Sequence, residues 1–416
     1  MSEASGVAQT AEPDRPDVPL LKLAERLPPV IETTREFDRL VELVGGASGP
    51  FAIDAERASG YRYSHRAYLI QIRRVGAGTA LIDPIPFGDV PHRMFEPLAE
   101  AVGDTEWVIH AASQDLPCLA EVGLRPRRLF DTELAGRLLN YPRVGLAALV
   151  EELLGYRMRK EHSAVDWSKR PLPEPWLLYA ALDVELLIEL REVLAEQLDR
   201  AGKREWAEQE FAAWATVPPT APKREPWRRT SGIHRVRGRR GLALVRALWQ
   251  VRDELARRRD ITTTRIVPDA AIVEAAQAAP KSRTALSRLP TFSTRGGQRY
   301  LREFYDAISA ASRLPESELP TLAGVADGPP MPRLWPDKNP AAADRLRRCR
   351  EIVAAIAAEA DLPQENLVAP DSVRRLAWEP PTPLTREAVE RELRALGARP
   401  WQIGLVAEGL TAALVG

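Results

Sequence analysis

The hydrophobic residues between positions 33 and 46 recur at the spacing of an amphipathic helix. Thr33 or Thr34 suits the start of this helix as a cap, and Gly45 suits its end. Its apolar face would be formed by Phe37, Leu40, Val41 and Val44. Short apolar or alternating runs, separated by Gly and Ser, then predict three consecutive strands at residues 50–56, 67–74 and 79–84.

Helical patterns alternate with further strands after this point. The run EWVIH at residues 106–110 predicts a strand, and the apolar pattern of residues 174–200 predicts one long helix. Strands that are first paired through hairpins and then alternate with helices indicate an α/β sheet covered on both faces.

Changes in composition divide the chain, which at 416 residues is longer than one core usually organises. The Pro- and Glu-containing N-terminus predicts a disordered tail, and two Pro-containing stretches predict linkers. Two segments with helical patterns, each of about 75 residues, have the size of small bundles. We therefore predict a tail (1–27), an α/β domain (28–213), a basic linker (214–238), a helical domain (239–313), a Pro-rich linker (314–339) and a second helical domain (340–416).

The formal charge of the chain is zero, with 58 basic and 58 acidic residues, but the charge is unevenly spread. Between Lys223 and Arg265, 14 basic minus 4 acidic residues leave a net charge of +10. This excess suits contact with a polyanion, although a solvated linker is the alternative. The two cysteines, Cys118 and Cys349, support neither a disulfide framework nor a cysteine metal cluster. Without a long apolar run or a signal-like start, the sequence predicts a cytoplasmic protein with no membrane contact.

Four acidic residues and one tyrosine carry the chemistry that the sequence predicts. Asp54 and Glu56 stand two positions apart in a predicted strand, so both side chains point to one side of the sheet. Asp115 follows a later strand, and Asp183 lies one helical turn after Tyr179 on the same face. Each acid alone has a plainer interpretation, as a solvated side chain or one favoured by the helix dipole. Together, carboxylates without Cys or His ligands select Mg²⁺ or Mn²⁺ and indicate a two-metal phosphodiesterase, in which Tyr179 holds the attacking water or helps to deprotonate it.

Three stretches of the chain resemble motifs of known nucleases. IDAE (53–56), HAASQDLPCL (110–119) and YAALDVELL (179–187) are similar to the exonuclease motifs of the DEDD superfamily, in its tyrosine branch. The stretch DWSKRPLPEPWLLYAALD (166–183) resembles ribonuclease D. The resemblance covers roughly residues 28–213 and implies a ribonuclease H-like fold. The two helical segments are similar to the helicase-and-RNase-D C-terminal (HRDC) domain, the second in a degenerate form.

This resemblance implies a metal-dependent 3′–5′ exoribonuclease that releases nucleotides from RNA 3′ ends, including those of tRNA precursors, without an obligatory protein partner. Asp54, Glu56, Asp115 and Asp183 would ligate two divalent ions, Mg²⁺ or Mn²⁺, and Tyr179 would position the water. Two alternatives stay open at this point. One is a 3′–5′ DNA exonuclease of repair, which uses the same four acids; the other is a non-catalytic nucleic-acid-binding adaptor.

Further side chains are predicted to contact the substrate. Gln71 lies on a strand that runs beside the site in relatives. Lys160, Lys169 and Arg170 flank the DWS sequence, where backbone phosphates are the expected partners. The structural alternatives are an ordinary edge-strand glutamine and a solvated basic loop.

Three other positions have a structural or a divergent character. His110 ends a predicted strand and is expected to be structural rather than a general base, and Trp167 and Trp176 are expected to pack rather than to stack on bases. Ribonuclease D commonly has Thr and an aromatic residue where this chain has Ala55 and Arg57. Contacts to the terminal nucleotide are therefore expected to differ.

Overall fold

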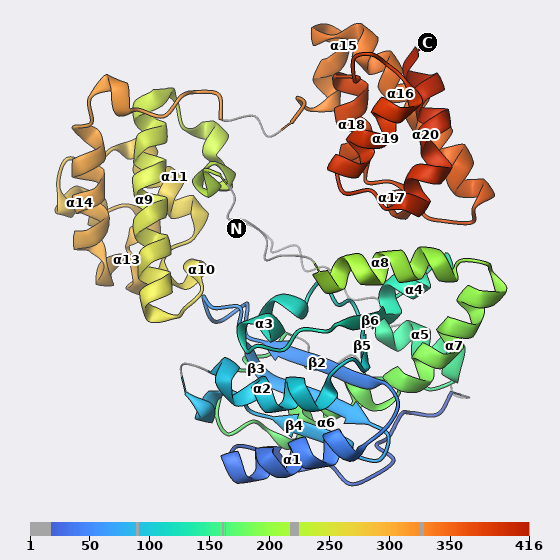
Figure 1. Ribbon diagram of the computed structural model, residues 1–416. Coiled ribbons are helices and arrows are strands. Elements are labelled where there is room, and N and C mark those ends of the chain that lie inside the picture. Colours follow the sequence, from blue (N-terminus) through green and yellow to red (C-terminus); the bar gives the residue numbers. More distant parts are fainter. Residues whose placement is uncertain are drawn as a thin grey trace.

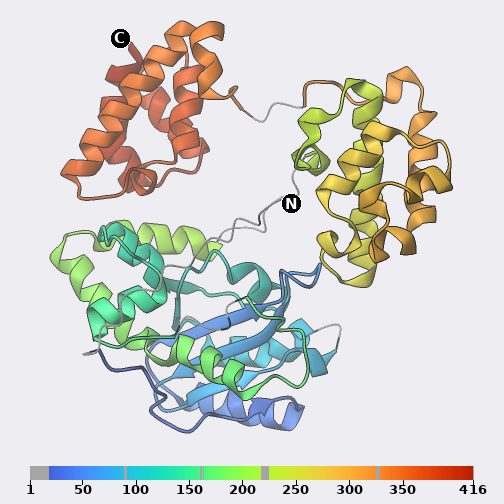
Figure 2. The same cartoon turned by 180° about the vertical axis from the view of Figure 1, so that it is seen from behind.

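The computed structural model describes residues 18–88, 91–159, 162, 164–216, 224–324 and 328–415. Three parts are distinguished in Figure 1: an α/β unit (up to residue 216), a middle bundle (224–324) and a C-terminal bundle (328–415). The two bundles lie on one side of the α/β unit, toward its opposite ends, and Figure 2 shows the same arrangement from behind. This confirms the predicted fold class, an α/β domain followed by small all-α domains.

A six-stranded mixed sheet forms the centre of the α/β unit, with the strand order β1-β4-β3-β2-β5-β6. Its strands are β1 (Val30–Ile31), β2 (Phe51–Arg57), β3 (Ala67–Arg74), β4 (Gly78–Ile82), β5 (Glu106–Ile109) and β6 (Arg128–Asp131). β3 runs antiparallel to β2 and β4, whereas β2 with β5, β5 with β6 and β1 with β4 are parallel. A short turn joins β3 to β4, a longer loop (58–66) joins β2 to β3, and the connections between parallel strands contain helices, as the sequence pattern predicts.

Helices cover both faces of this sheet. They are α1 (Thr34–Gly46), α2 (Pro91–Val102), α3 (Leu116–Glu121), α4 (Thr132–Leu138), α5 (Leu146–Leu154), α6 (Glu174–Glu185), α7 (Leu187–Arg200) and α8 (Arg204–Thr216), with the 3-10 helix η1 (Ile85–Phe87). α1 and α2 pack together over one face, where the rings of Phe37 and Phe95 lie 5.2 Å apart between centroids. α6 crosses β2, β3 and β4 on the other face. Alternate strand residues serve the two faces: Ile70 joins the core under α1, and Leu69 joins the core under α6.

A capping box begins α1. The Thr33 hydroxyl accepts a hydrogen bond from the Glu36 amide at 3.3 Å, and the Glu36 carboxylate accepts one from the Thr33 amide at 3.2 Å. Two amides that the first helical turn leaves unpaired are thereby satisfied. Phe37, Leu40 and Val44 are buried, in agreement with the predicted apolar face.

One predicted helix is two helices in the structure. Residues 174–200 divide into α6 and α7 at Leu186, whose backbone angles are φ −114° and ψ 12°. Beside this break the buried Glu185 carboxylate lies 3.2 Å from Arg73 Nη1 and accepts a hydrogen bond from the Ala24 amide at 3.0 Å. The prediction of one helix is wrong. The apolar period continues through Leu186, so it gives no sign of the break, and Glu185 beside the break contacts residues far away in the sequence.

The predicted tail and linkers contain buried anchors. Residues 18–27 run along the α/β unit, where Leu21 is buried and its amide donates to the Arg157 carbonyl oxygen at 2.9 Å. Trp227, in the first predicted linker, is buried in the middle bundle, and Trp335, in the second, is buried in the C-terminal bundle. Leu21, Trp227 and Trp335 therefore belong to the folded parts, while residues 1–17, 217–223 and 325–327 of the predicted tail and linkers lie outside the described residues.

The middle bundle contacts the loop between β2 and β3. Its elements are η2 (Pro226–Arg229), η3 (Ile233–Arg235), α9 (Gly238–Arg259), α10 (Thr263–Ile266), α11 (Asp269–Ala278), α12 (Arg283–Ser287), η4 (Pro290–Phe292), α13 (Arg295–Arg299), α14 (Leu301–Ser312) and η5 (Glu316–Glu318). Asp260, just after α9, accepts hydrogen bonds from the Ser64 amide at 2.8 Å and the Tyr68 hydroxyl at 3.2 Å. The Thr262 amide donates to the Tyr61 carbonyl oxygen at 3.1 Å. The end of α9 therefore lies beside the loop between β2 and β3 (Figure 1).

The C-terminal bundle packs on α8. Its elements are η6 (Pro332–Leu334), α15 (Trp335–Lys338), α16 (Pro340–Glu359), α17 (Gln364–Leu367), α18 (Pro370–Trp378), α19 (Arg386–Ala395) and α20 (Pro400–Val415). Trp401 stacks on Trp206 of α8 with 4.9 Å between ring centroids. The Trp401 indole N–H also donates to buried Glu210 at 3.1 Å, so the contact is both apolar and specifically oriented.

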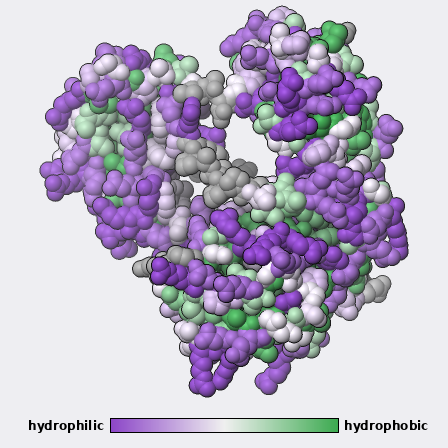
Figure 3. Space-filling view, viewed as in Figure 1, coloured by the Kyte–Doolittle hydropathy of each residue, from purple (hydrophilic) through white to green (hydrophobic). Residues whose placement is uncertain are grey.

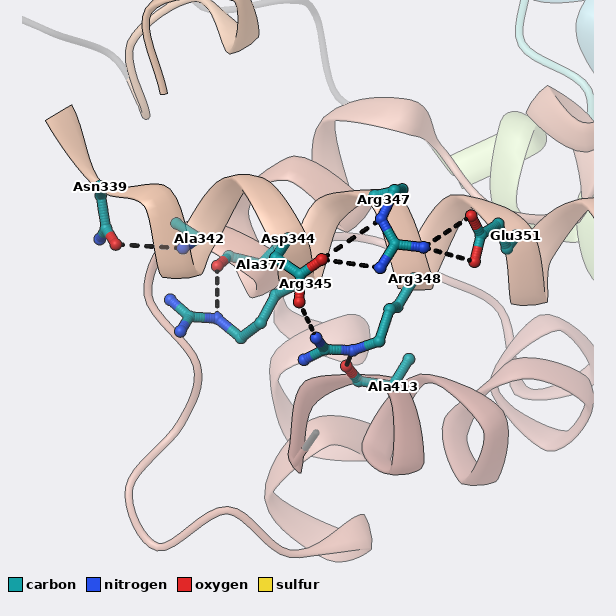
Figure 4. Close-up of polar contacts among 9 residues, drawn as sticks. All are labelled: Asn339, Ala342, Asp344, Arg345, Arg347, Arg348, Glu351, Ala377 and Ala413. Atoms are coloured by element: carbon teal, nitrogen blue, oxygen red, sulfur yellow. Dashed lines mark hydrogen bonds and ion pairs between the residues drawn. The ribbon is translucent and has the colours of Figure 1, made fainter. Parts of the chain in front are cut away.

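Ion pairs line the exposed side of α16. Arg347 lies between Asp344 and Glu351, at 2.7 and 2.9 Å, as Figure 4 shows. Exposed pairs at this spacing each stabilise a helix by only about 0.2–0.5 kcal/mol, so they keep the surface solvated more than they hold the bundle together. Hydrophilic side chains cover much of the face seen in Figure 3. In the part of the chain that the structure describes, no helix combines the length and the apolar character needed to span a bilayer.

Candidate active site

Asp54 and Glu56 lie on the face of β2 that α6 covers. Residues alternate along the strand, so Ile53 and Ala55 join the core under α1 while the two acids point to the opposite face. The neighbouring strand β3 places Gln71 opposite Asp54. Glu56 is only 8% exposed, so its carboxylate lies in a buried interface between sheet and helix.

α6 brings Tyr179 and Asp183 to the same place. One helical turn separates the two residues, which puts their side chains on one face, and the Tyr179 hydroxyl opposes the rise that burial causes in the pKa of Asp183. One oxygen from each of Asp54, Glu56 and Asp183 lies within 4.8 Å of the others. The structure thus brings together three of the four predicted carboxylates, with the tyrosine beside them.

The turn after β5 directs Asp115 toward this cluster. Ala111 adopts a φ of 56°, and the amides of Ala111 and Ala112 donate to the Asp131 carboxylate at 3.0 and 2.8 Å. These bonds hold a conformation that is unfavourable for a residue with a side chain. The sequence prediction missed Asp131; the signal for it is an Asp–Thr–Glu start to a helix, since Asp131 also caps α4.

The Asp115 carboxylate points to the cluster rather than to the helix that follows it. It makes no capping bond to α3, and it interacts instead with the side chain of Asp54. Its Oδ1 lies 3.4 Å from Nη2 of Arg57. Asp115 is outside the three carboxylates that meet within 4.8 Å, so it adjoins them through Asp54.

Burial raises the pKa of all four carboxyl groups. Loss of water is the largest cause for each, and the charges of neighbouring acids add to it at Glu56, Asp115 and Asp183, where the pKa lies well above its usual value. The positive charge of Arg57 opposes this rise in pKa at Asp54, Glu56 and Asp115. A cation among these groups would favour their charged forms and lower the pKa of each.

The same surroundings keep the Tyr179 phenol protonated. Burial first, and then the charges of Asp183, Glu56 and Asp54, raise the pKa of Tyr179 above its usual value. At neutral pH the hydroxyl is therefore a hydrogen-bond donor and not a phenolate base. This favours the first of the two predicted roles, holding a water molecule, over helping to deprotonate it.

The donor set fits a hard divalent cation. Among the described residues, the group that could hold an ion consists of carboxylates from Asp54, Glu56 and Asp183, with neither sulfur nor imidazole. Oxygen-only donor sets are preferred by Mg²⁺ and Mn²⁺. Divalent metal use is therefore consistent with both the chemistry and the burial of the site.

Gln71 contacts Glu56 and is inaccessible to solvent. Its Nε2 donates to Glu56 Oε1 at 3.5 Å, and its own Oε1 is buried without a hydrogen-bond partner in the described chain. The geometry favours orientation of Glu56 as the role of this side chain, and a contact with substrate stays a prediction.

The basic residues around the DWS sequence differ in their surroundings. Arg170 donates from Nη2 to Asp83 Oδ1 at 2.8 Å and to the Tyr68 carbonyl oxygen at 2.7 Å, and its Nε also pairs with Asp83. These bonds favour a structural role for Arg170 in its loop. Lys169 is exposed, so its contact with phosphate stays a prediction, and Lys160 lies outside the described residues.

Two further predicted side chains have structural surroundings. Trp167 is fully buried and packs edge-on against Trp176, with 5.6 Å between ring centroids. Nδ1 of His110 lies 2.9 Å from the Thr132 hydroxyl, and burial lowers the pKa of His110 to about 4. The imidazole is therefore neutral at neutral pH and hydrogen-bonded within the fold.

Models of known families match three regions of the chain. Residues 28–199 match a 3′-5′ exonuclease domain, residues 241–308 match the HRDC domain, and residues 328–414 match a 3′ to 5′ exonuclease C-terminal domain. With the cluster of carboxylates on β2 and α6, these matches define a protein of the 3′–5′ exonuclease class.

Relatives identify the family more closely. Ribonuclease D from Jannaschia sp. is 30% identical over 337 residues, which cover 77% of this chain and 82% of the relative. Ribonuclease D from Gluconacetobacter diazotrophicus is 29% identical over 387 residues, 90% of each chain. The chain belongs to the ribonuclease D family.

Solved structures agree with this assignment. A protein from Bifidobacterium adolescentis is 38% identical, with a TM-score of 0.87, and the match covers 96% of this chain and 100% of that one. Escherichia coli RNase D, an exoribonuclease involved in structured RNA processing, is 25% identical, with a TM-score of 0.68 and coverage of 93% and 98%.

Proposed function

We propose that the chain is a metal-dependent 3′–5′ exoribonuclease that removes nucleotides from RNA 3′ ends by hydrolysis. The observation that carries the proposal is the convergence of Asp54, Glu56 and Asp183 within 4.8 Å, in a buried setting that Asp115 adjoins. Membership of the ribonuclease D family supports RNA as the substrate and does not favour the DNA exonuclease. The presence of all four acids and Tyr179 argues against the non-catalytic adaptor.

In this proposal the four carboxylates hold two divalent ions, Mg²⁺ or Mn²⁺. When bound, such ions activate water as a nucleophile and stabilise charge on the departing oxygen. The protonated Tyr179 hydroxyl donates a hydrogen bond that positions the attacking water. Gln71 orients Glu56, and the buried surroundings keep bulk water away, which strengthens every electrostatic contact in the site.

Basic side chains outside the site are expected to hold the RNA, because the carboxylates themselves repel phosphate. Part of the positive charge at residues 223–265 is used within the protein, as the buried ion pair of Arg252 with Asp269 illustrates. Arg258 and Arg259, in the last turn of α9, are exposed, and this end of α9 lies beside the loop that follows β2. We assign these two arginines to the RNA backbone.

The physiological substrates in this proposal are structured RNAs with single-stranded 3′ ends, tRNA precursors among them. The role of the Escherichia coli relative in structured RNA processing supports this choice. The C-terminal and middle bundles, which flank one side of the α/β unit, provide the surface beyond the site that a structured RNA needs.

A labelled-substrate assay tests the activity. Single-stranded RNA and DNA of equal sequence, labelled at the 5′ end, are incubated with Mg²⁺, Mn²⁺ or EDTA and with wild type, Asp54→Asn or Asp104→Asn. Asp104 is the matched control, because its side chain is 81% exposed and it precedes β5, whereas Asp115 follows that strand. We expect a one-nucleotide ladder on RNA that EDTA and Asp54→Asn abolish and Asp104→Asn preserves. Cleavage that persists in EDTA or in Asp54→Asn would exclude the proposed site, and preferred cleavage of DNA would establish the alternative substrate.

RNA binding is tested separately by its salt dependence. Affinity measured by fluorescence anisotropy should fall linearly with the logarithm of salt concentration. The double change Arg258→Gln and Arg259→Gln should reduce that slope by about 2, roughly 1 for each phosphate that is no longer neutralised. Binding that does not respond to salt, or an unchanged slope in the double variant, would remove these arginines from the RNA interface.

A further inference from the structure

Arg57 is a positively charged side chain that contacts Asp115, the carboxylate that adjoins Asp54, Glu56 and Asp183. It follows Glu56 in the sequence, and its Nη2 lies 3.4 Å from Asp115 Oδ1. The Asp115 side chain is 6% exposed, whereas that of Arg57 is 27% exposed. One end of this ion pair is therefore in the buried site and the other is open to solvent.

A bulge in the sheet accounts for the position of Arg57. The pairing register of β2 and β3 shifts between Glu56 and Arg57, where β3 holds one extra residue, Tyr68. Bulges increase the local twist of a strand and redirect its side chains. Strict alternation would point Arg57 away from the face that carries Asp54 and Glu56, but at this bulge its guanidinium reaches Asp115 on that same face.

The guanidinium has capacity for a second ligand. In the described part of the chain Arg57 makes the ion pair with Asp115 and no hydrogen bond, so donors on Nε and Nη1 stay available. Planar guanidinium groups bind phosphate through two parallel hydrogen bonds, which a lysine cannot reproduce. The exposed side of Arg57 therefore has the chemistry to bind an RNA phosphate at the entrance of the site.

We propose that Arg57 has two exchangeable partners: it neutralises Asp115 in the free enzyme, in competition with a divalent cation, and it binds a phosphate near the RNA 3′ end when substrate is present. The proposal rests on the proposed function. It predicts two classes of ion affinity, tight where Asp54, Glu56 and Asp183 converge and weak at Asp115, where a cation must displace the guanidinium.

Two substitutions separate the two partners. Arg57→Met removes the charge and keeps the aliphatic bulk, whereas Arg57→Lys keeps a charge but loses the planar guanidinium with its parallel N–H donors. Arg127→Met is the matched control, since Arg127 pairs with Asp104 on the surface and its side chain is 71% exposed. All are made in the full chain, and Asp54→Asn is included as a site-null variant.

Ion binding is measured without RNA, by titrating Mn²⁺ and following the electron paramagnetic resonance signal of the free ion. Removal of a positive charge a few ångströms from Asp115 should tighten the weaker Mn²⁺ site roughly tenfold in Arg57→Met. Arg57→Lys and Arg127→Met should follow the wild-type curve. The KM for RNA, measured in saturating Mn²⁺, should rise roughly tenfold in both Arg57 variants, because neither side chain can form the charge-assisted bidentate pair with phosphate.

Superimposable Mn²⁺ curves for wild type and Arg57→Met would overturn the competition for Asp115. An unchanged KM in both Arg57 variants, or an equal rise in Arg127→Met, would overturn the phosphate interaction. Failure of the proposed function has a different signature, in which Asp54→Asn binds Mn²⁺ and cleaves RNA as the wild type does. The two failures are therefore distinguishable in one set of variants.

Discussion

Asp183→Asn should stabilise the ion-free protein while it abolishes catalysis. Oxygens of Asp54, Glu56 and Asp183 lie within 4.8 Å of one another. Two unit charges 4.8 Å apart repel by about 3.5 kcal/mol at an effective dielectric constant of about 20. Protonation relieves part of this repulsion, because the pKa of each carboxyl is raised. We therefore expect Asp183→Asn to increase the free energy of unfolding by about 1–3 kcal/mol in EDTA at neutral pH. Asn has the size of Asp and keeps one oxygen that can accept a hydrogen bond.

Asp83 supplies the matched contrast for this prediction. It is 1% exposed and pairs with two guanidinium nitrogens of Arg170. Breaking a buried ion pair by removing one partner costs about 3–5 kcal/mol, and somewhat less where one partner is partly exposed. Asp83→Asn should therefore destabilise the protein, although both substitutions remove one negative charge. The two substitutions differ because the Asp83 carboxylate pairs with a guanidinium, whereas the Asp183 carboxylate lies among other carboxylates.

Thermal unfolding of the full chain in EDTA measures both effects. A change of 1 kcal/mol shifts the Tm of a domain of this size by about 2–4 °C, so Asp183→Asn should raise the transition of the α/β unit and Asp83→Asn should lower it. In saturating Mg²⁺ the wild type should overtake Asp183→Asn, since an ion at 100 times its Kd stabilises the folded state by about 2.7 kcal/mol. A lower Tm for Asp183→Asn than for wild type in EDTA would refute the reasoning that these carboxylates repel one another.

Three further predictions concern the same site. Tyr179→Phe should slow single-turnover hydrolysis roughly 10²-fold and leave RNA affinity unchanged, and equal rates would remove the hydroxyl from the mechanism. Gln71→Met should lower the rate but change the free energy of unfolding by less than about 1 kcal/mol, because a long hydrogen bond to Glu56 is removed together with an unpaired buried oxygen. Urea unfolding beside the rate assay checks this, and a destabilisation above about 1 kcal/mol would contradict it. In the ion-free protein, the contribution of the four carboxyls to the free energy of unfolding should fall as pH rises above about 4. The folded-state pKa of each of the four carboxyls is raised, so their contribution is complete below the unfolded value near 4 and is lost as pH passes through the folded values. Urea unfolding in EDTA of the wild type beside Asp183→Asn isolates this contribution. The wild type should lose stability relative to Asp183→Asn as pH rises, and a constant difference between the two would contradict the prediction.

The placement of the acids was predictable because two simple periodicities govern it. A period of two in a strand puts Asp54 and Glu56 on one face, and a period near four in a helix puts Tyr179 and Asp183 on one face. That the two faces meet, and that Asp115 adjoins them, came from the resemblance to known exonucleases, since spacing within single elements says nothing about how elements pack.

Other features depend on contacts between residues far apart in the sequence, and these escaped prediction. Trp227 and Trp335 sit in stretches dominated by Pro and charged residues, so composition over a window concealed two buried anchors. The apolar period of the sequence continues across the break between α6 and α7 at Leu186, so periodicity could not reveal it. The contact of Arg57 with Asp115 accompanies a shift in sheet register, and the pairing of Arg170 with buried Asp83 requires a loop to fold back on the sheet.

Anomalous diffraction from crystals grown with Mn²⁺ shows whether these carboxylates form a metal site, because it locates ions independently of activity. The account predicts one Mn²⁺ peak bounded by Asp54, Glu56 and Asp183 and a second, weaker peak beside Asp54 and Asp115. Both peaks should vanish in Asp54→Asn, whose side chain contributes to each. Crystals that hold Mn²⁺ elsewhere on the molecule, with no anomalous density among these carboxylates, would contradict the account.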